Sequence, residues 1–139
     1  MLTRAALATA LVLSVSVLAS AQTRVLTTIP AGVMTVSDWY RQSVYDPMDK
    51  KIGTINDVLI TKDGKVEVLI VGVGGFVGVG AKDVAVAPAA VSMTTKNNKA
   101  YLVMNSTKDE LKSAPGFKFD RTSRTWVPAD TTPPPNKKK

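Results

Sequence analysis

Residues Val66–Val73 form a run that is almost wholly apolar and rich in β-branched side chains. β-Branched residues favour strands, and an unbroken apolar run of this length is typical of a strand that is buried on both faces. The sequence therefore predicts a central strand here, covered by the rest of the fold.

Further strand and turn patterns lie on both sides of this run. Lys51–Thr61 carries apolar residues at uneven spacing, which predicts a strand with a bulge near Asn56–Asp57. Asp63–Gly64 predicts a tight hairpin turn into the central strand, since both residues tolerate positive φ. Asp46–Asp49, which contains a proline at its second position, predicts a turn before the first clear strand.

The second half of the chain predicts more short strands. Asp83–Ala87 is expected as a strand ended by Pro88, with Pro88–Ala90 as a short turn of helix. Val91–Thr95 and Ala100–Met104 are expected as a hairpin with asparagines at its tip.

Two helix starts are expected. Thr107 and Glu110 fit a capping box that opens a helix through about Ser113, which Pro115–Gly116 stops. Ser37 is expected to cap a single helical turn at residues 37–40. The aromatic residues that follow the helix are expected to pack back on the sheet: Phe117, Phe119 and Trp126. These elements predict an all-β fold, either a rolled sheet or, as the preferred form, a small β-barrel of about six short strands with one short C-terminal helix.

The N-terminus predicts an export signal. A positive charge at Arg4 precedes an uncharged, largely apolar run over residues 5–18, and small residues stand at Ala19 and Ala21, which predicts cleavage before Gln22. A membrane anchor is the alternative, but a span needs about 20 apolar residues and this run is shorter. We therefore expect an exported, periplasmic protein without stable membrane insertion after cleavage.

The expected organisation has four parts. They are a signal peptide at residues 1–21, an extended leader at 22–35, a barrel domain with its helix at 36–128, and a disordered tail rich in proline and lysine at 129–139.

Composition excludes several functions. The chain has no cysteine and no histidine, which removes disulfides and the usual zinc, copper and haem ligands, so no cofactor or metal is expected. The formal net charge is +7, but three of these charges lie at Lys137–Lys139 and the other basic residues are interleaved with aspartates. Because a nucleic-acid binder concentrates its basic residues on one face, no nucleic-acid partner is expected. The three terminal lysines could make at most a weak contact with an anionic lipid surface, and a solubilising tail is the simpler interpretation.

The glycine-rich stretch Gly72–Gly80 does not fit a nucleotide-binding motif. No register places glycines at the spacing of the dinucleotide fingerprint, and a strand rather than a helix is expected after it. We interpret it as a connection that covers the core or contacts a partner, and the candidate partner-binding residues are Gly74, Gly75, Phe76, Val77, Gly78 and Val79.

Catalytic groups are scarce, so no catalytic residue is predicted. Asp46 and Asp49 are interpreted as turn residues, and Asp57 as a carboxylate that satisfies backbone N–H groups at the bulge. The aromatic cluster of Trp39, Tyr40 and Tyr45 could mark a binding surface, but large aromatics are more often buried.

Several of these segments together resemble the PRC-barrel domain family. The similar segments are Ser43–Pro47, Lys51–Ile60, Asp63–Val66, Val71–Phe76 and Gly80–Val86. The resemblance covers about residues 36–105, and the helix with Ala114–Phe117 resembles the tail of exported bacterial single-domain members. It implies a small β-barrel that serves as an adaptor, and the family has no catalytic residues that could be assigned to this chain.

The sequence thus predicts a non-enzymatic protein-binding module of the bacterial cell envelope that binds a protein partner or itself. The alternative is a small-ligand or ion-binding barrel that uses its mouth near Tyr45, Asp46 and Asp57.

Overall fold

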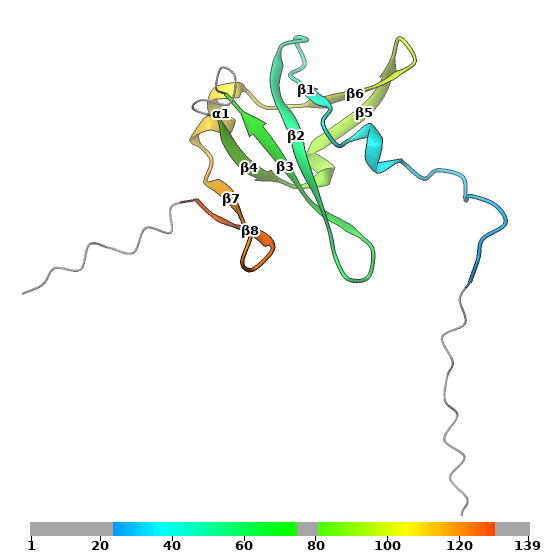
Figure 1. The fold of residues 1–139 in the computed structure, drawn as a ribbon. Coiled ribbons are helices and arrows are strands. Elements are labelled where there is room, and N and C mark those ends of the chain that lie inside the picture. The colour runs from blue at the N-terminus through cyan, green and yellow to red at the C-terminus, as the bar shows by residue number, and fades with distance from the viewer. Residues whose placement is uncertain (1–23, 75–80, 130–139) are drawn as a thin grey trace, which may run out of the picture. The chain divides into compact units, whose positions relative to one another are not determined.

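The computed structural model describes residues 24–74 and 81–129 (Figure 1). The folded unit that holds the sheet begins at Met34, and the described residues before it contain no helix or strand. The elements in chain order are η1 (Val36–Asp38), β1 (Ser43–Tyr45), β2 (Lys51–Ile60), β3 (Val66–Val73), β4 (Lys82–Val86), η2 (Pro88–Ala90), β5 (Val91–Lys96), β6 (Lys99–Met104), α1 (Lys108–Ser113), β7 (Gly116–Asp120) and β8 (Thr125–Pro128). Among the described residues, no helix has the length and apolar character needed to cross a membrane.

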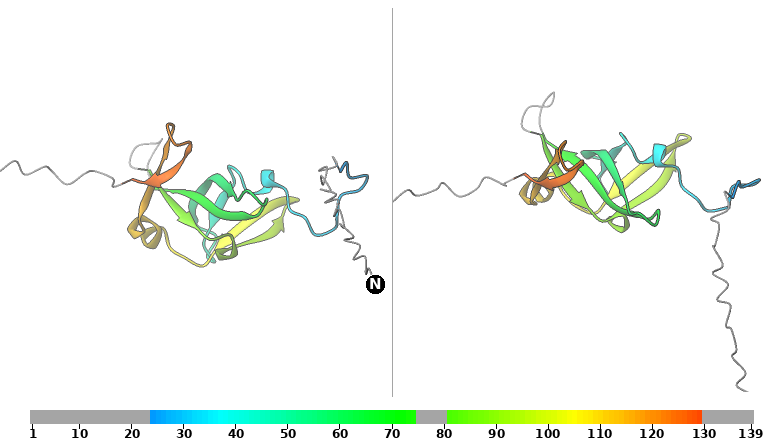
Figure 2. Two further views of the ribbon diagram at one scale, coloured as in Figure 1. Left: turned by 90° about the horizontal axis from the view of Figure 1, so that it is seen from below. Right: turned by 60° about the horizontal axis from the view of Figure 1, so that its bottom comes forward.

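The eight strands form one open sheet in the order β5-β6-β1-β2-β3-β4-β7-β8. All neighbours are antiparallel except β1 and β6, which run parallel. Figure 2 shows the sheet strongly twisted, so that the hairpin of β5 and β6 lies at a steep angle to β2 and β3. The prediction of a closed barrel of about six strands is therefore wrong in strand number and in closure, although the β-rich class and the short helix are confirmed.

The extra strands are the ones whose local pattern is weakest. β1 has only three residues, too few to show alternation, and it becomes a strand because β2 and β6 pair with it on either side. β7 and β8 form a hairpin that extends the sheet from β4 (Figure 1). Their aromatic residues were expected to pack on the sheet, whereas they belong to strands of it.

The core lies where β3 crosses the middle of the sheet. Leu69, Ile70 and Val71 are consecutive and all buried, so both faces of this half of β3 are covered, as predicted. The first two residues of the strand are exposed, so the prediction holds only for the second half. The largest fully buried side chains are Ile55, Leu69, Ile70, Leu102, Val44, Val71, Val73 and Val84. Leu111 of α1 joins the same core cluster and holds the helix against the sheet.

Local sequence signals account for most turns. The β2–β3 register shifts between Ile55 and Asp57, which confirms the predicted bulge. Asn97 and Asn98 both have positive φ (52° and 59°), as the two-residue turn between β5 and β6 requires. Pro88–Ala90 forms the predicted helical turn, and the Thr107–Glu110 capping box is complete.

Two turn predictions need correction. The β2–β3 turn is wider than a tight hairpin, because its closing hydrogen bond joins Thr61 N to Lys65 O, and only Gly64 has positive φ there. Thr35, not Ser37, caps the first helical turn, because its hydroxyl accepts a hydrogen bond from Asp38 N at 3.2 Å.

Asp57 ties the C-terminal hairpin to the bulge of β2. One of its carboxylate oxygens accepts the Val58 N–H at 2.8 Å, in line with the structural role predicted for it. The other oxygen accepts the Trp126 Nε1–H of β8 at 2.7 Å, a contact between residues 69 positions apart. The bulge therefore points the Asp57 carboxylate toward the β7–β8 hairpin, and the hydrogen bond to Trp126 positions β8.

We expect Trp126→Phe to lower the free energy of unfolding by about 1–3 kcal/mol, because a partly buried carboxylate oxygen loses its donor. Urea unfolding followed by circular dichroism measures this change. Phe119→Leu is the matched control, because Phe119 lies on the same hairpin, packs edge-on against Trp126 and is 49% exposed. Equal losses in the two variants would contradict the role given to the Asp57 hydrogen bond.

Candidate functional site

A stacked pair of tyrosines lies on the outer face of the sheet where β1 and β6 run side by side. The parallel register pairs Val44 with Leu102, and both are fully buried. Because successive side chains of a strand point to opposite faces, Tyr45 and Tyr101 project to the other side. Their ring centroids are 4.7 Å apart and their planes differ by 19°.

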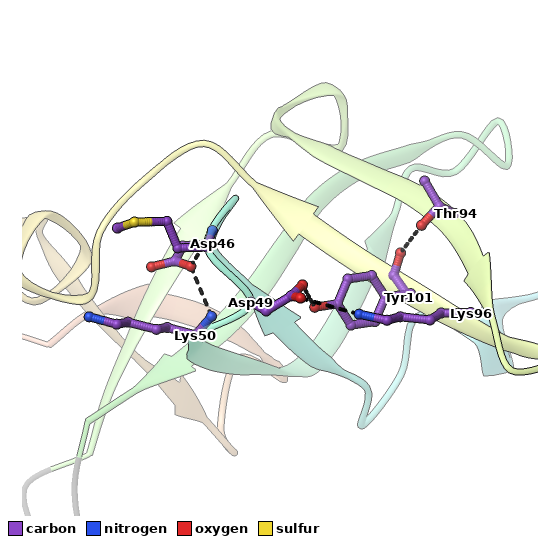
Figure 3. A network of polar contacts seen from close by, with 7 residues as sticks. Asp46, Asp49, Lys50, Thr94, Lys96 and Tyr101 are labelled. Atoms are coloured by element: carbon purple, nitrogen blue, oxygen red, sulfur yellow. Dashed lines mark hydrogen bonds and ion pairs between the residues drawn. The ribbon is translucent and has the colours of Figure 1, made fainter.

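The turn before β2 brings Asp49 to Tyr101 of this pair, as Figure 3 shows. The buried Asp46 carboxylate accepts the backbone N–H groups of Met48 and Lys50 at 2.8 and 2.9 Å, which stabilises the predicted turn. Asp49 takes a left-handed conformation there, with φ of 61°. Its carboxylate then accepts the hydroxyl hydrogen bond of Tyr101 at 2.5 Å.

Lys96 completes the arrangement from β5. Its Nζ lies 3.3 Å from the second carboxylate oxygen of Asp49 and 4.6 Å from the centroid of the Tyr101 ring. Thr94, which is directly opposite Tyr101 in the β5–β6 register, donates its hydroxyl to the Tyr101 carbonyl. We call the set of Tyr45, Tyr101, Asp49 and Lys96 the tyrosine face.

Electrostatic contacts change the ionisation of two members of the tyrosine face. The hydrogen bond to Asp49 raises the pKa of Tyr101 to about 12, with smaller effects of desolvation and of nearby negative charge. The same hydrogen bond, followed by the contacts with Lys96, lowers the pKa of Asp49. The Tyr101 contribution to stability is therefore complete below the ordinary tyrosine pKa near 10 and is lost as pH rises through about 12. The Asp49 contribution is complete above its ordinary pKa of 3.8 and is lost as pH falls through its lowered value.

The raised pKa of Tyr101 can be tested by titration. The tyrosinate absorbance of the protein, minus that of Tyr101→Phe, is expected to rise at about pH 12. Replacing Asp49 with Asn removes the charged acceptor. In that background the Tyr101 absorbance signal is expected to rise at a lower pH, closer to the ordinary tyrosine pKa. A Tyr101 signal that is unchanged by Asp49→Asn would contradict the assigned cause.

A surface pocket of ≈ 530 Å³ opens beside the tyrosine face. It lies between the start of β1 and the turn that joins β5 to β6, and its walls include Arg41, Lys99 and Asn97 in addition to the tyrosine face. Of the described residues that line it, all except Ala100 carry polar or charged side chains.

A sequence model of the PRC-barrel domain matches residues 31–111, which is more than half of the chain. The chain belongs to the PRC-barrel family. A search of curated proteins finds no match to it. The β7–β8 hairpin lies C-terminal to the matched residues.

The predicted partner-binding loop of this PRC-barrel protein is described only at its start. Gly74 has a positive φ of 74° and lies beside a second pocket with Lys51 and Lys108. The other candidate residues lie outside the described part of the chain: Gly75, Phe76, Val77, Gly78 and Val79. The same holds for Ala19, Ala21 and Gln22 of the expected cleavage site and for Lys137–Lys139.

The residues of the predicted ligand mouth have structural partners. Asp46 accepts two backbone N–H groups, and Asp57 accepts one backbone N–H and an indole N–H. Within residues 24–74 and 81–129, no group of three acidic, histidine or cysteine residues could hold a metal ion. Of the three residues, only Tyr45 lines the pocket at the tyrosine face.

The predicted aromatic cluster divides between core and surface. Trp39 is buried, Tyr40 is 42% exposed, and Tyr45 is half-buried in the stack with Tyr101. Sequence reasoning missed Tyr101 and Lys96 because they lie in the β5–β6 hairpin, far along the chain from Tyr45. No local pattern shows that β1 lies next to β6. The asparagine turn does fix the β5–β6 register, so it could have placed Thr94 opposite Tyr101.

Proposed function

We propose that this PRC-barrel protein is a non-enzymatic protein-binding module of the bacterial cell envelope. The observation that carries the proposal is the tyrosine face, where two stacked rings are held in place by Asp49 and Lys96. Tyrosine rings supply large, rigid contact areas at low entropic cost and are enriched at protein interfaces.

The neighbouring end strand offers a second element of recognition. The two-residue turn makes Lys96 and Lys99 a hydrogen-bonded pair, and such pairs alternate with non-hydrogen-bonded pairs along an antiparallel ladder. Met93 and Thr95 therefore belong to non-hydrogen-bonded pairs, and their backbone N–H and C=O groups point away from β6. β5 is an end strand of the sheet, so these groups are available to a strand from another chain. A partner, or a second copy of this chain, could thus pair with β5 while covering the tyrosine face.

The proposed location in the cell envelope and the proposed absence of catalytic activity are inferred from the sequence. The expected export signal supports the envelope, and the absence of histidine and cysteine removes the commonest general base and thiol nucleophile.

The test is crosslinking and capture of partners from envelope extracts with the exported protein, compared with Tyr101→Ala. We expect the variant to lose a defined partner, or a homodimer, that the wild type retains. Phe119→Ala is the matched control, because it removes a 49% exposed aromatic from the distant hairpin. Circular dichroism shows whether both variants are folded. The tyrosine face would be refuted as the contact surface if the partner pattern survived Tyr101→Ala, or if Phe119→Ala changed it to the same extent.

A small-ligand function is the second candidate, and the ≈ 530 Å³ pocket beside Tyr45 is the observation that favours it. A thermal-shift screen with metal ions and metabolites distinguishes the two candidates. A ligand present at a hundred times its dissociation constant is expected to stabilise the protein by about 2.7 kcal/mol. No shift across a broad panel would count against this function.

A further inference from the structure

We infer that the pocket beside the tyrosine face binds carboxylate side chains of an acidic, extended peptide segment. This inference rests on the proposed function, since it names the chemistry of the partner segment that reaches the same surface. Three observations carry it: an excess of positive charge in the pocket, two lysines held opposite each other, and an arginine in an unfavourable backbone conformation.

The pocket walls carry more positive than negative charge. Among the described residues that line it, Arg41, Lys96 and Lys99 are cationic and Asp49 is the one carboxylate. An adjoining hollow shares Lys99 and adds Asp38. The two hollows together therefore carry three cations and two carboxylates, which leaves an excess of positive charge.

Lys96 and Lys99 are directly opposite each other at the turn end of β5 and β6. Like charges in this position repel each other. Asp49 pairs with Lys96 at 3.3 Å, whereas Lys99 has no ion pair among the described residues. A carboxylate placed between the two lysines would relieve the repulsion and supply the missing partner.

The existing ion pair leaves room for such a ligand. The Lys96 and Asp49 side chains are 52% and 66% exposed, so water screens their attraction. The Asp49 oxygens are also shared between the Lys96 ammonium and the Tyr101 hydroxyl. Because an ammonium has three N–H donors, Lys96 can donate a hydrogen bond to a second carboxylate and keep its ion pair with Asp49.

Arg41 stands at the pocket in a conformation that suits glycine or asparagine. Its φ is 64°, in the left-handed region that costs free energy for a residue with a long side chain. Its backbone N–H donates to Ile55 O at 2.7 Å, which holds this conformation, and its guanidinium lies 5.3 Å from the Tyr40 ring centroid. Backbone strain of this kind concentrates at binding sites, and a guanidinium can bind a carboxylate through two parallel hydrogen bonds.

The form of the ligand follows from the surroundings of the pocket. Lys96 is the last residue of β5, whose outward backbone groups can pair with an extended chain. A peptide that pairs with β5 would point alternate side chains to the face of the sheet that carries Lys96, with Lys99 and Tyr101 on the next strand, β6. A short acidic segment in extended conformation fits these features together.

The probe is a ten-residue peptide of alternating Glu and Thr. Its uncharged control is the peptide of the same length in which every Glu is replaced by Gln. Binding to the exported protein is measured by calorimetry at low and at raised salt. We expect the acidic peptide to bind, the uncharged peptide to bind at least about tenfold more weakly, and salt to weaken the acidic peptide further.

Two variants and a matched control locate the binding. Lys99→Gln is expected to weaken the acidic peptide about two- to fivefold, as is typical of an exposed charge pair. Arg41→Asn keeps a residue that tolerates the left-handed backbone, so it should remove the guanidinium and weaken binding without unfolding the domain. Lys62→Gln removes an exposed lysine from the β2–β3 turn and is expected to leave binding unchanged.

Several outcomes would overturn the inference. They are equal binding of the two peptides, no binding at millimolar concentration, equal effects of Lys99→Gln and Lys62→Gln, and inorganic phosphate that displaces the peptide and binds more tightly. Failure of the proposed function is recognised separately. Partner capture that depends on Tyr101 but not on Lys99 refutes only the acidic segment, whereas peptide binding without any captured partner refutes the protein-binding role.

Discussion

Replacing Ile55 with alanine is expected to destabilise the protein by about 2–5 kcal/mol, the usual range for an isoleucine truncated in a packed core. Ile55 is fully buried on β2. It pairs with Val71 of β3, while its backbone exchanges hydrogen bonds with the residues that precede β1: Arg41 N–H to Ile55 O at 2.7 Å and Ile55 N–H to Gln42 O at 2.9 Å. A cavity at this point would weaken the packing between the two halves of the sheet.

The control for this prediction is Ile60→Ala, the same substitution on the same strand. Ile60 is 53% exposed and lies at the end of β2, so its loss is expected to cost less than about 1 kcal/mol. Urea unfolding of both variants measures the change in the free energy of unfolding that each substitution causes. If the dependence of that free energy on urea concentration is unchanged, the compactness of the folded and unfolded states is preserved. If the two substitutions cost the same, the assigned core is wrong.

Gly53→Ala is the second substitution with a large expected effect, about 1–3 kcal/mol of destabilisation from overpacking. Gly53 is buried in β2, between Val44 of β1 and the β3 strand. A Cβ atom at this position would lie 2.7 Å from Val71 Cγ1 and 2.9 Å from Gly72 O. The second neighbour is backbone, so the strands themselves would have to separate.

Gly116→Ala is the matched control, because it makes the same change in another strand of the sheet. The nearest atom to its added Cβ is Lys82 Cε at 3.1 Å, the far part of a flexible side chain that can move aside. We expect a change within about 0.5 kcal/mol for this variant. Thermal unfolding of the two variants side by side tests the difference, and a Gly53→Ala protein as stable as wild type would show that β2 and β3 are not as close as described.

The elements that the sequence predicted well are those with a complete local signal. The asparagine turn between β5 and β6, the capping box of α1 and the bulge at Asp57 each depend on a few neighbouring residues whose backbone preferences are strong. The central strand was recognised from the apolar residues of its second half, Leu69–Val73, because burial on both faces disfavours polar residues.

Apart from the β2–β3 turn and the cap of the first helical turn, the predictions that failed concern contacts between distant segments. β1 is a strand only because its parallel neighbour β6 and its antiparallel neighbour β2 provide hydrogen bonds on both sides. The open, eight-stranded sheet arises because the C-terminal hairpin extends β4, with Trp126 fastened to Asp57. Neither pairing has a signature within a window of ten or so residues.

The tyrosine face shows the same division. The sequence by itself determined that Asp46–Asp49 is a turn and that the asparagines close a hairpin whose second strand, Ala100–Met104, contains Tyr101. Only the tertiary structure decided that these segments meet, because side-chain stacking, the Asp49–Tyr101 hydrogen bond and the excess of positive charge around Lys99 depend on which strands are neighbours. Local backbone preferences act over a few residues and can be read along the chain, whereas a surface built from two distant segments, residues 45–49 and 96–101, exists only after the sheet has assembled.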